Sequence, residues 1–339
     1  MGRTKPGDYA TSWKAPDYTV DDRGKVVGGY TPREPNNWGR WGEDDQRGTQ
    51  NLIGPEQRVA AAQLVKTGKI FALGLPLTPD APVWPPRPAP QRLATMTGSD
   101  AVVGSPANAP APGFQWSDDI LTVATHGSTH WDGLGHAMCE DSLYNGFWAG
   151  NVTALAGCGV LGIEQQRDCF VGRGVLVDVA RHQRVEACPP RQVITPQMLD
   201  EALAAQGSEL RSGDMLLVRT GHLARWWTRP ADQTPMNYFV NSPGISRDAA
   251  PWLHEHGISA LAADTIGVEP LIPEDSDERV FPLHVASLVD QGLTLGELWV
   301  LDDLAADCAA DGSYEFLLAA QPLNLPGGMG SPINPIALK

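Results

Sequence analysis

Three of the eight histidines of the chain and one aspartate fall within eleven residues, at His126, His130, Asp132 and His136. Imidazoles and carboxylates are the side chains that bind divalent metals and carry protons near neutral pH. Residues 120–125, just before this segment, are rich in β-branched types and predict a strand that leads into it. We therefore interpret residues 126–136 as the active site.

The spacing of these four residues restricts the backbone that can carry them. On a helix the first two histidines would share a face, but the aspartate would point about 200° away from the second one. On a strand all four project to one side, although a straight strand would hold the first two histidines about 13 Å apart. One metal needs both ring nitrogens within about 2.1 Å, so the segment must bend. Gly127 and Ser128 can supply this bend, and Gly133 and Gly135 allow a second turn before His136.

Composition describes a globular protein and excludes some partners. The chain has 339 residues, of which 42% are hydrophobic and 19% charged, which allows one or two domains. A formal charge of −15 argues against nucleic acid or an anionic membrane as partner. The five cysteines form no CxxC pair and are odd in number, which favours reduced thiols. No run of about 18 apolar residues and no apolar N-terminal region occurs, so we expect a cytoplasmic protein.

Two units are predicted along the chain. Residues 1–36 are polar and aperiodic, and predict an extended N-terminal arm; residues 37–339 predict a single catalytic domain. Apolar runs at 174–180, 214–220 and 258–264 predict buried strands, and helix-starting patterns at 195 and 246 lie between them. This alternation predicts an α/β fold with a mixed sheet.

Polar or aromatic residues outside the central segment are further candidates. Glu297 lies in the apolar run 293–301, where an isolated buried charge would cost several kcal/mol, so it must be paired, metal-bound or turned outward. Residues 282–292, which contain His284, predict a short helix. Trp84 lies on a proline-rich loop that can hold it rigidly in a pocket wall. Residues 86–117, rich in Pro, Ala and Gly, predict a long surface loop or flap.

The central segment resembles the pattern His-x-Gly-Thr-His-x-Asp-x-Pro-x-His of the cyclase family, which includes bacterial kynurenine formamidase and isatin hydrolase. Ser128 stands here in place of the Gly and Gly135 in place of the Pro. Further stretches resemble the same family, so that the similarity covers about residues 70 to 335: 82–85, 174–178, 213–221, 263–266, and His284 with Glu297. The resemblance implies a mixed-sheet fold of the swivelling β/β/α type.

The resemblance also implies a role for each candidate. His126, His130 and Asp132 would bind one divalent metal, Mn²⁺ or Zn²⁺, and Asp132 would be able to bridge to a second ion. His284 and Glu297 would hold that second ion, although they lie thirteen residues apart where the family leads us to expect twelve; isatin hydrolase relatives use one manganese ion. His136 would be the catalytic acid and base, and Trp84 would contact the substrate.

The implied activity is hydrolysis of a small molecule. A divalent ion lowers the pKa of a bound water toward roughly 7, and the resulting hydroxide would attack an amide, formamide, cyclic imide or lactone. His136 would protonate the leaving atom. A non-hydrolytic lyase or dehydratase, or a metal-supported binding protein, remains the alternative. We also expect a homodimer or homotetramer.

The other reactive side chains fit structural roles better. We interpret His182, His222, His254 and His256 as surface or hydrogen-bonded core residues. Nothing in the sequence marks Cys139 as an activated thiol. Ser128 lacks the Gly-x-Ser-x-Gly elbow of a serine nucleophile.

Overall fold

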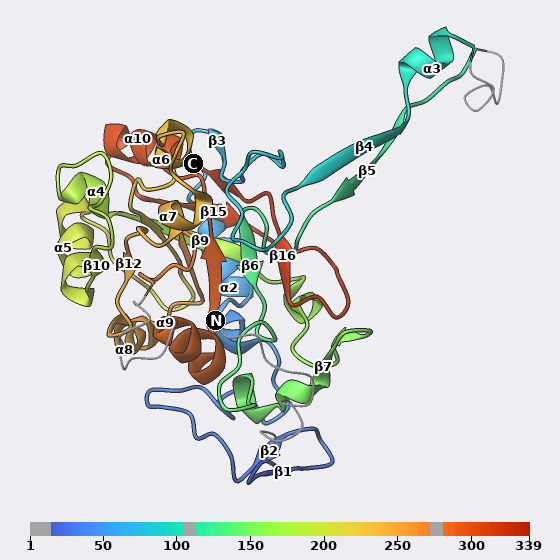
Figure 1. Cartoon of the computed structure of the whole chain (residues 1–339). Helices are drawn as coiled ribbons and strands as arrows, with labels where there is room; N and C mark the ends of the chain where they lie inside the picture. The colour runs from blue at the N-terminus through green and yellow to red at the C-terminus, as the bar shows by residue number, and fades with distance from the viewer. Residues whose placement is uncertain (1–14, 105–112, 272–280) are drawn as a thin grey trace.

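One nine-stranded mixed sheet organises the chain (Figure 1). The computed structural model describes residues 15–104, 113–271 and 281–339. In spatial order the strands are β16 (Gly330–Pro332), β6 (His130–Asp132), β14 (Thr294–Glu297), β13 (Ala260–Ala263), β11 (Met215–Arg219), β9 (Val171–Asp178), β15 (Glu315–Ala319), β17 (Ile336–Leu338) and β3 (Ile70–Ala72). Strands β9, β11, β13 and β14 are parallel to one another, and the outer strands are antiparallel to their neighbours. The expected α/β fold with a mixed sheet is confirmed.

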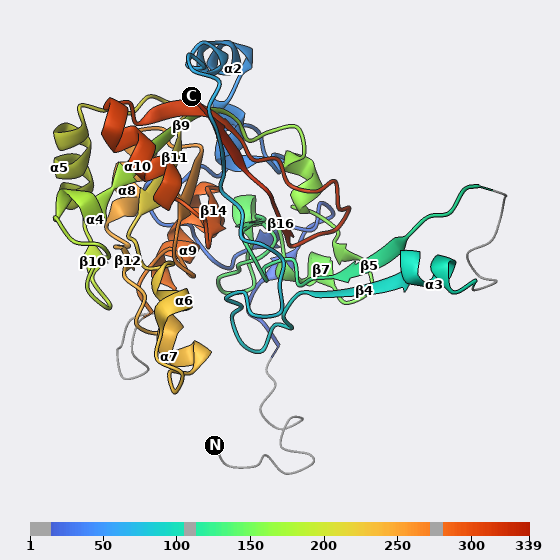
Figure 2. The ribbon, with the colours of Figure 1, turned by 90° about the horizontal axis from the view of Figure 1, so that it is seen from above.

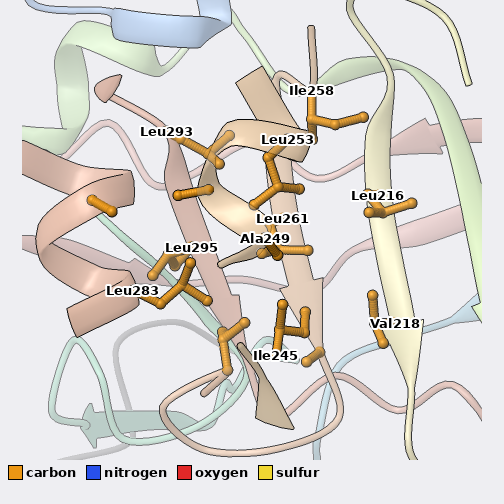
Figure 3. Close-up of a cluster of buried hydrophobic side chains, with 14 of the residues drawn as sticks. Leu216, Val218, Ile245, Ala249, Leu253, Ile258, Leu261, Leu283, Leu293 and Leu295 are labelled. Atoms are coloured by element: carbon orange, nitrogen blue, oxygen red, sulfur yellow. The ribbon is translucent and has the colours of Figure 1, made fainter. Parts of the chain in front are cut away.

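The parallel strands are mostly apolar because both of their faces are covered. Along β11, Leu216 and Val218 join one hydrophobic cluster, whereas Met215 and Leu217 join the cluster on the opposite face. This alternation follows from the two-residue period of a strand. Figure 3 shows the first cluster, in which side chains of β11, β13 and β14 lie beneath those of α8 (Ala249–Glu255). The second cluster is closed by α10 (Asp302–Asp311).

Helix α5 (Pro196–Gln206) shows how local sequence sets the helix ends. The Thr195 hydroxyl accepts a hydrogen bond from the backbone N–H of Met198, and Pro196 occupies the first helical position. Gly207, with φ of 68°, ends the helix in the left-handed conformation that glycine adopts without strain. Leu199 and Leu203 pack into the cluster shown in Figure 3.

The remaining elements are short. The helices are α2 (Pro55–Ala62), α3 (Gly98–Val102), α4 (Val179–His182), α6 (Arg225–Thr228), α7 (Pro235–Phe239), α9 (Pro282–His284), the π-helix η6 (Val285–Gln291), and the 3₁₀ turns η1 (Gly48–Leu52), η3 (Tyr144–Gly146), η4 (Ala149–Asn151) and η5 (Ile163–Gln166). The strands outside the sheet pair two by two: β1 (Thr19–Val20) with β2 (Val26–Val27), β4 (Gln91–Met96) with β5 (Asp118–Thr122), β7 (Val152–Thr153) with β8 (Gly157–Cys158), and β10 (Val193–Ile194) with β12 (Gly244–Ile245).

The region expected to be a loop or flap contains an extended hairpin. Strands β4 and β5 form a two-stranded arm that stands away from the body, with α3 near its tip (Figure 2). The strand expected before the active site is therefore present, but it pairs in this arm and not in the main sheet. Sequence patterns missed β4 because both faces of the arm are exposed, so neither strand has a buried face to set a two-residue period. Residues 105–112 lie outside the described part of the chain.

The described part of the N-terminal region, residues 15–36, lies against the body. The Gly24 carbonyl accepts a hydrogen bond from the backbone N–H of Trp148 (2.8 Å), and the Tyr30 hydroxyl donates to Asp290 (2.7 Å). Residues 1–14, the rest of the predicted arm, lie outside the described residues, and the division into arm and domain stays a prediction. Among the helices that the structure describes, none has the length and apolarity to cross a membrane.

Candidate active site

The central segment bends as its spacing requires. Strand β6 holds only residues 130–132, and the chain turns before it at residues 125–129 and after it at residues 134–136. A hydrogen bond from the Gly127 N–H to the Ala124 carbonyl (2.8 Å) closes the first turn, and one from the His136 N–H to the Gly133 carbonyl (2.9 Å) closes the second. The predicted bends at Gly127 and Gly133 are therefore present, and the four polar residues can converge.

Glu297 reaches the same place through strand pairing. Strand β14 is antiparallel to β6, with Glu297 directly opposite His130 in the register. Directly opposed residues put their side chains on the same face of a sheet. The carboxylate Oε2 of Glu297 lies 3.4 Å from His130 Nε2. Glu297 therefore reaches the cluster, although thirteen residues separate it from His284.

Asp132 is the centre of this cluster, and its two carboxylate oxygens face different partners. Oδ1 lies 3.5 Å from His126 Nε2, 3.4 Å from His130 Nε2 and 3.8 Å from His136 Nε2. Oδ2 lies 3.7 Å from His284 Nε2, which is in turn 3.5 Å from Glu297 Oε1. The structure thus brings together all six candidate metal-binding and proton-transferring residues, and Asp132 lies between the two pairs of candidate ligands, as a bridging carboxylate would.

Contacts on the far side of three imidazole rings fix their orientation. His130 Nδ1 lies 2.6 Å from the Ser128 carbonyl, and His126 Nδ1 lies 3.0 Å from the Thr125 hydroxyl. The His284 Nδ1 lies 2.6 Å from Glu269 Oε1. Each ring therefore directs Nε2 toward Asp132, as metal-binding histidines do when an outer partner holds the other nitrogen.

Glu269 was not identified from the sequence. Its carboxylate is buried and also accepts the backbone N–H groups of Leu283 and His284, both at 2.8 Å. The signal was available, because Glu269 stands in the apolar stretch Ile266-Gly-Val-Glu-Pro270, where the argument applied to Glu297 holds equally.

The donor set fits a divalent cation. Within this cluster, four buried atoms have no hydrogen-bond partner among the described residues: His126 Nε2, His130 Nε2, and both carboxylate oxygens of Asp132. Buried polar atoms are normally paired, so an unpaired group of this kind indicates a missing ligand. Mixed imidazole and carboxylate donors suit Zn²⁺ and Mn²⁺. Gly330 of β16 adds to the fit, since a Cβ at this position would collide with His126 Nε2.

The pKa values of the buried histidines depend on burial and on the charges of the same cluster. Burial, with a smaller contribution from the nearby His136, lowers the pKa of His126 to about 3. Burial alone would also lower the pKa of His130, but the close carboxylates of Asp132 and Glu297 outweigh it and raise the pKa to about 9. His284 behaves in the same way: Glu269 and Glu297 overcome burial and raise its pKa to about 10. Without a metal, two protons therefore balance the buried carboxylates, and a divalent cation would compete with them.

The two departures from the family pattern have different structural settings. A Cβ at Gly135 would lie 2.5 Å from Cys158 Sγ, so the space that a proline ring would need is taken by this thiol. Ser128 is buried, and its carbonyl is the group that orients His130. Both positions therefore act on backbone shape and ring orientation.

A cavity of about 290 Å³ opens above the cluster. His136, His284 and Glu297 are its polar floor, and Trp84 is part of its wall, as the sequence predicted. Its lining also includes Arg87, which the sequence did not single out. The Trp84 ring packs against Phe239, with ring centroids 5.6 Å apart. Its contact with a substrate stays a prediction.

The other four histidines do not belong to this cluster. His182 lies 3.8 Å from Glu201 near the surface, His222 stacks on Tyr238, and His256 packs against Trp252. His254 is half-buried on helix α8. None of these contacts joins the cluster, but the expected hydrogen-bonded core role is not seen for His222, which is buried with neither ring nitrogen paired among the described residues. Cys139 is buried and forms no disulfide.

The chain has an α/β fold with a curled mixed sheet, and its imidazoles and carboxylates converge beneath a pocket. Together the fold and the site define the class of protein to which it belongs. The chain belongs to the cyclase family: the family model described as putative cyclase matches residues 71–270. A crystal structure described as a novel cyclase superposes with a TM-score of 0.84 at 43% identity, covering 90% of this chain and 99% of that one.

More distant relatives have named activities. Isatin hydrolase A from Labrenzia aggregata has a similar fold, with a TM-score of 0.55 at 19% identity over 83% of this chain and 97% of that one. Kynurenine formamidase from Bacillus anthracis is 32% identical over 94 residues, which are 28% of this chain and 39% of the formamidase. The matched part thus spans well under half of that curated relative.

Proposed function

We propose that the protein is a metal-dependent hydrolase that cleaves an amide, formamide, cyclic imide or lactone bond of a small molecule. The observation that carries this proposal is the unpaired buried donor set at His126, His130 and Asp132, placed beneath a cavity of about 290 Å³. Membership of the cyclase family supports it, since kynurenine formamidase and isatin hydrolases are among the related proteins.

The resemblance to the cyclase family supplies the ligand assignment, and the closeness of the side chains in the cluster supports it. His126, His130 and Asp132 would hold one Mn²⁺ or Zn²⁺ ion, and His284 with Glu297 would hold a second where two are bound, with Asp132 between them. Such an ion supplies a Lewis acid and makes water a better nucleophile near neutral pH.

His136 is the group placed to move protons. Its side chain is 27% exposed and lines the cavity, while Nε2 faces Asp132. An imidazole can take a proton from the attacking water and deliver it to the leaving nitrogen or oxygen, because its unperturbed pKa of about 6.5 suits both transfers. Trp84 would hold the substrate against this group from the cavity wall.

Metal analysis and a substrate panel test the proposal. Protein purified without chelator should contain a transition ion, and with added Mn²⁺ or Zn²⁺ it should hydrolyse a compound from a panel of formamides, isatin, imides and small lactones. His130→Ala should lose metal and activity together, whereas His182→Ala, a histidine beside a carboxylate outside the cluster, should keep both. Absence of metal from the wild-type protein, or full metal content and activity in His130→Ala, would exclude this site. A metal-loaded protein that eliminates water from a substrate instead of adding it would favour the lyase alternative.

We also propose a homodimer or homotetramer in the cytoplasm. Apolar side chains on the projecting arm support association, since Leu93, Ile120 and Leu121 are 68%, 55% and 48% exposed, and an isolated two-stranded hairpin is only marginally stable in water. Five buried cysteines that form no disulfide fit a reducing compartment. Sedimentation velocity of the wild type and of a Leu93→Ser, Ile120→Ser variant tests the assembly: the wild type should sediment as an oligomer and the variant should dissociate.

A further inference from the structure

The cavity above the candidate metal centre has an apolar wall and one isolated cation. Its apolar lining residues are Trp84, Ala137, Met138, Ile266, Leu271, Phe281 and Val285. Apart from His136, His284 and Glu297 on the floor, the charged residue among the described residues that line it is Arg87. A wall of this kind accepts a ring or a branched apolar group, and polar groups within it select the ligand.

Arg87 is held in place but keeps most of its hydrogen-bonding capacity. Its Nη1 donates to the His126 carbonyl at 2.9 Å, and its backbone N–H donates to the Trp84 carbonyl at 2.9 Å, which closes a turn. Within the described ranges it forms no ion pair with a carboxylate. A guanidinium has five N–H donors, so donors remain for a ligand.

Arg87 also lies beside the candidate metal centre, because its Nη1 donates to the backbone carbonyl of His126, one of the proposed ligands. The turn between Trp84 and Arg87 therefore presents an aromatic ring and a guanidinium to the same cavity, near the group proposed to transfer protons.

We propose that Arg87 selects substrates in which a carboxylate lies next to the ring or branched group that carries the scissile amide or ester bond. The carboxylate would form a charge-assisted hydrogen-bonded pair with the guanidinium, while the apolar part packs on Trp84 and Phe281. A neutral analogue leaves the guanidinium without a partner in a pocket closed by the ligand, which penalises its binding. This inference rests on the proposed hydrolase function and names its substrate class.

Two formamides that differ only in the carboxylate test the inference. N-formylanthranilate carries it and formanilide lacks it. Wild-type protein loaded with Mn²⁺ or Zn²⁺ should hydrolyse the first with a kcat/KM about 10- to 100-fold higher, the range of a hydrogen bond to a charged group. Arg87→Gln, which keeps a polar side chain without the positive charge, should remove this preference through KM. Arg87→Lys should keep part of it, because the charge remains but the fork is lost. Arg92→Gln is the matched control, as Arg92 lies on the exposed arm and should change nothing.

A binding experiment separates failure of the inference from failure of the proposed function. Calorimetry of the metal-loaded protein with benzoate and benzyl alcohol needs no turnover, so it tests Arg87 even if neither formamide is hydrolysed. Benzoate should bind the wild type more tightly than benzyl alcohol, and Arg87→Gln should lose about 10-fold or more in benzoate affinity. A benzoate preference that persists in Arg87→Gln would assign the carboxylate to the metal and overturn the inference. A kcat that falls equally for both formamides in Arg87→Gln would also overturn it, because Arg87 would then act on the reaction and not on selection.

Discussion

His136 differs from the other histidines of the cluster in its exposure. Its side chain is 27% exposed, whereas those of His126, His130 and His284 are at most 10% exposed. Geometry alone also allows it to bind metal, since its ring nitrogen, that of His126 and an Asp132 oxygen lie within 4.8 Å of one another. One substitution can therefore decide whether His136 is a proton carrier or a metal ligand.

Replacement of His136 by asparagine separates these two roles. Asparagine keeps a polar side chain of similar size but does not titrate near neutral pH. If His136 transfers protons, the variant should keep the wild-type metal content while kcat falls by about 10²- to 10⁴-fold. Metal analysis on the same preparation used for kinetics makes the comparison. Loss of metal from the variant would instead show that His136 is a ligand.

Glu269 should act on metal binding through His284. Its carboxylate fixes the ring by contact with Nδ1 at 2.6 Å, and such outer partners typically contribute 10- to 100-fold to metal affinity. We expect Glu269→Gln to weaken binding at the second position by about this factor and to leave the first position unchanged. Titration of Mn²⁺ or Zn²⁺ into chelator-treated protein measures both.

The control for this substitution is a similar pair at the surface. Glu201 lies 3.8 Å from His182 and is half-exposed. Glu201→Gln should leave the titration unchanged. If wild type and Glu269→Gln bind metal with equal affinity, the carboxylate charge does not set the orientation of the His284 ring. The backbone N–H groups of Leu283 and His284 would then set it.

Sequence patterns revealed the four site residues that lie close together in the sequence. They missed Arg87, which reaches the site from a more distant part of the chain. His126, His130, Asp132 and His136 were found because their shared parity on a strand brings them together. Arg87 gave no such signal, because its position depends on a turn and on a hydrogen bond across 39 residues.

At the scale of elements, the same contrast appears between the sheet and the arm. Strands β9, β11 and β13 were predicted because both faces are buried and the sequence is continuously apolar. Strand β4 in the arm has no such pattern, since its side chains face solvent on both sides. The equally exposed β5 was predicted only from its β-branched residues, so without burial the prediction depended on residue type alone.

Helix α7 supports the Trp84 loop, and this support can be tested. Phe239 is fully buried and packs between Trp84 and Trp226, with ring centroids 5.6 and 5.7 Å away. Phe239→Leu removes these ring contacts, so we expect a loss of about 1–2 kcal/mol in the free energy of unfolding and a several-fold rise in KM, with kcat and metal content retained. Urea denaturation and steady-state kinetics measure these effects.

Phe316→Leu provides the comparison for that variant. Phe316 is equally buried but belongs to a different hydrophobic cluster, which includes residues of β15 and α10. It should lose similar stability with no change in KM. A parallel rise in KM in both variants would attribute the effect to general loosening and not to the Trp84 loop.

At the scale of the whole molecule, the buried carboxylates make folding depend on a cation. Asp132, Glu269 and Glu297 are each at most 4% exposed and lie in one cluster. Buried charges require compensation, and either a divalent metal or the protons of His130 and His284 can provide it. The metal-free and metal-loaded proteins should therefore differ in how stability depends on pH.

For metal-free protein the sign follows from the raised pKa values. His130 and His284 titrate at about 9 and 10 in the folded state, compared with about 6.5 unfolded. Above about pH 6.5 the folded state binds more protons than the unfolded state, so the free energy of unfolding should fall as pH rises from 7 to 9.5. Added Mn²⁺ or Zn²⁺ replaces these protons, so the rise in Tm that it produces should grow over the same interval. Thermal denaturation of chelator-treated and metal-loaded protein at several pH values measures this, with His182→Ala behaving as wild type and His130→Ala losing the metal-dependent shift. A Tm difference that shrinks as pH rises would contradict compensation by these two histidines.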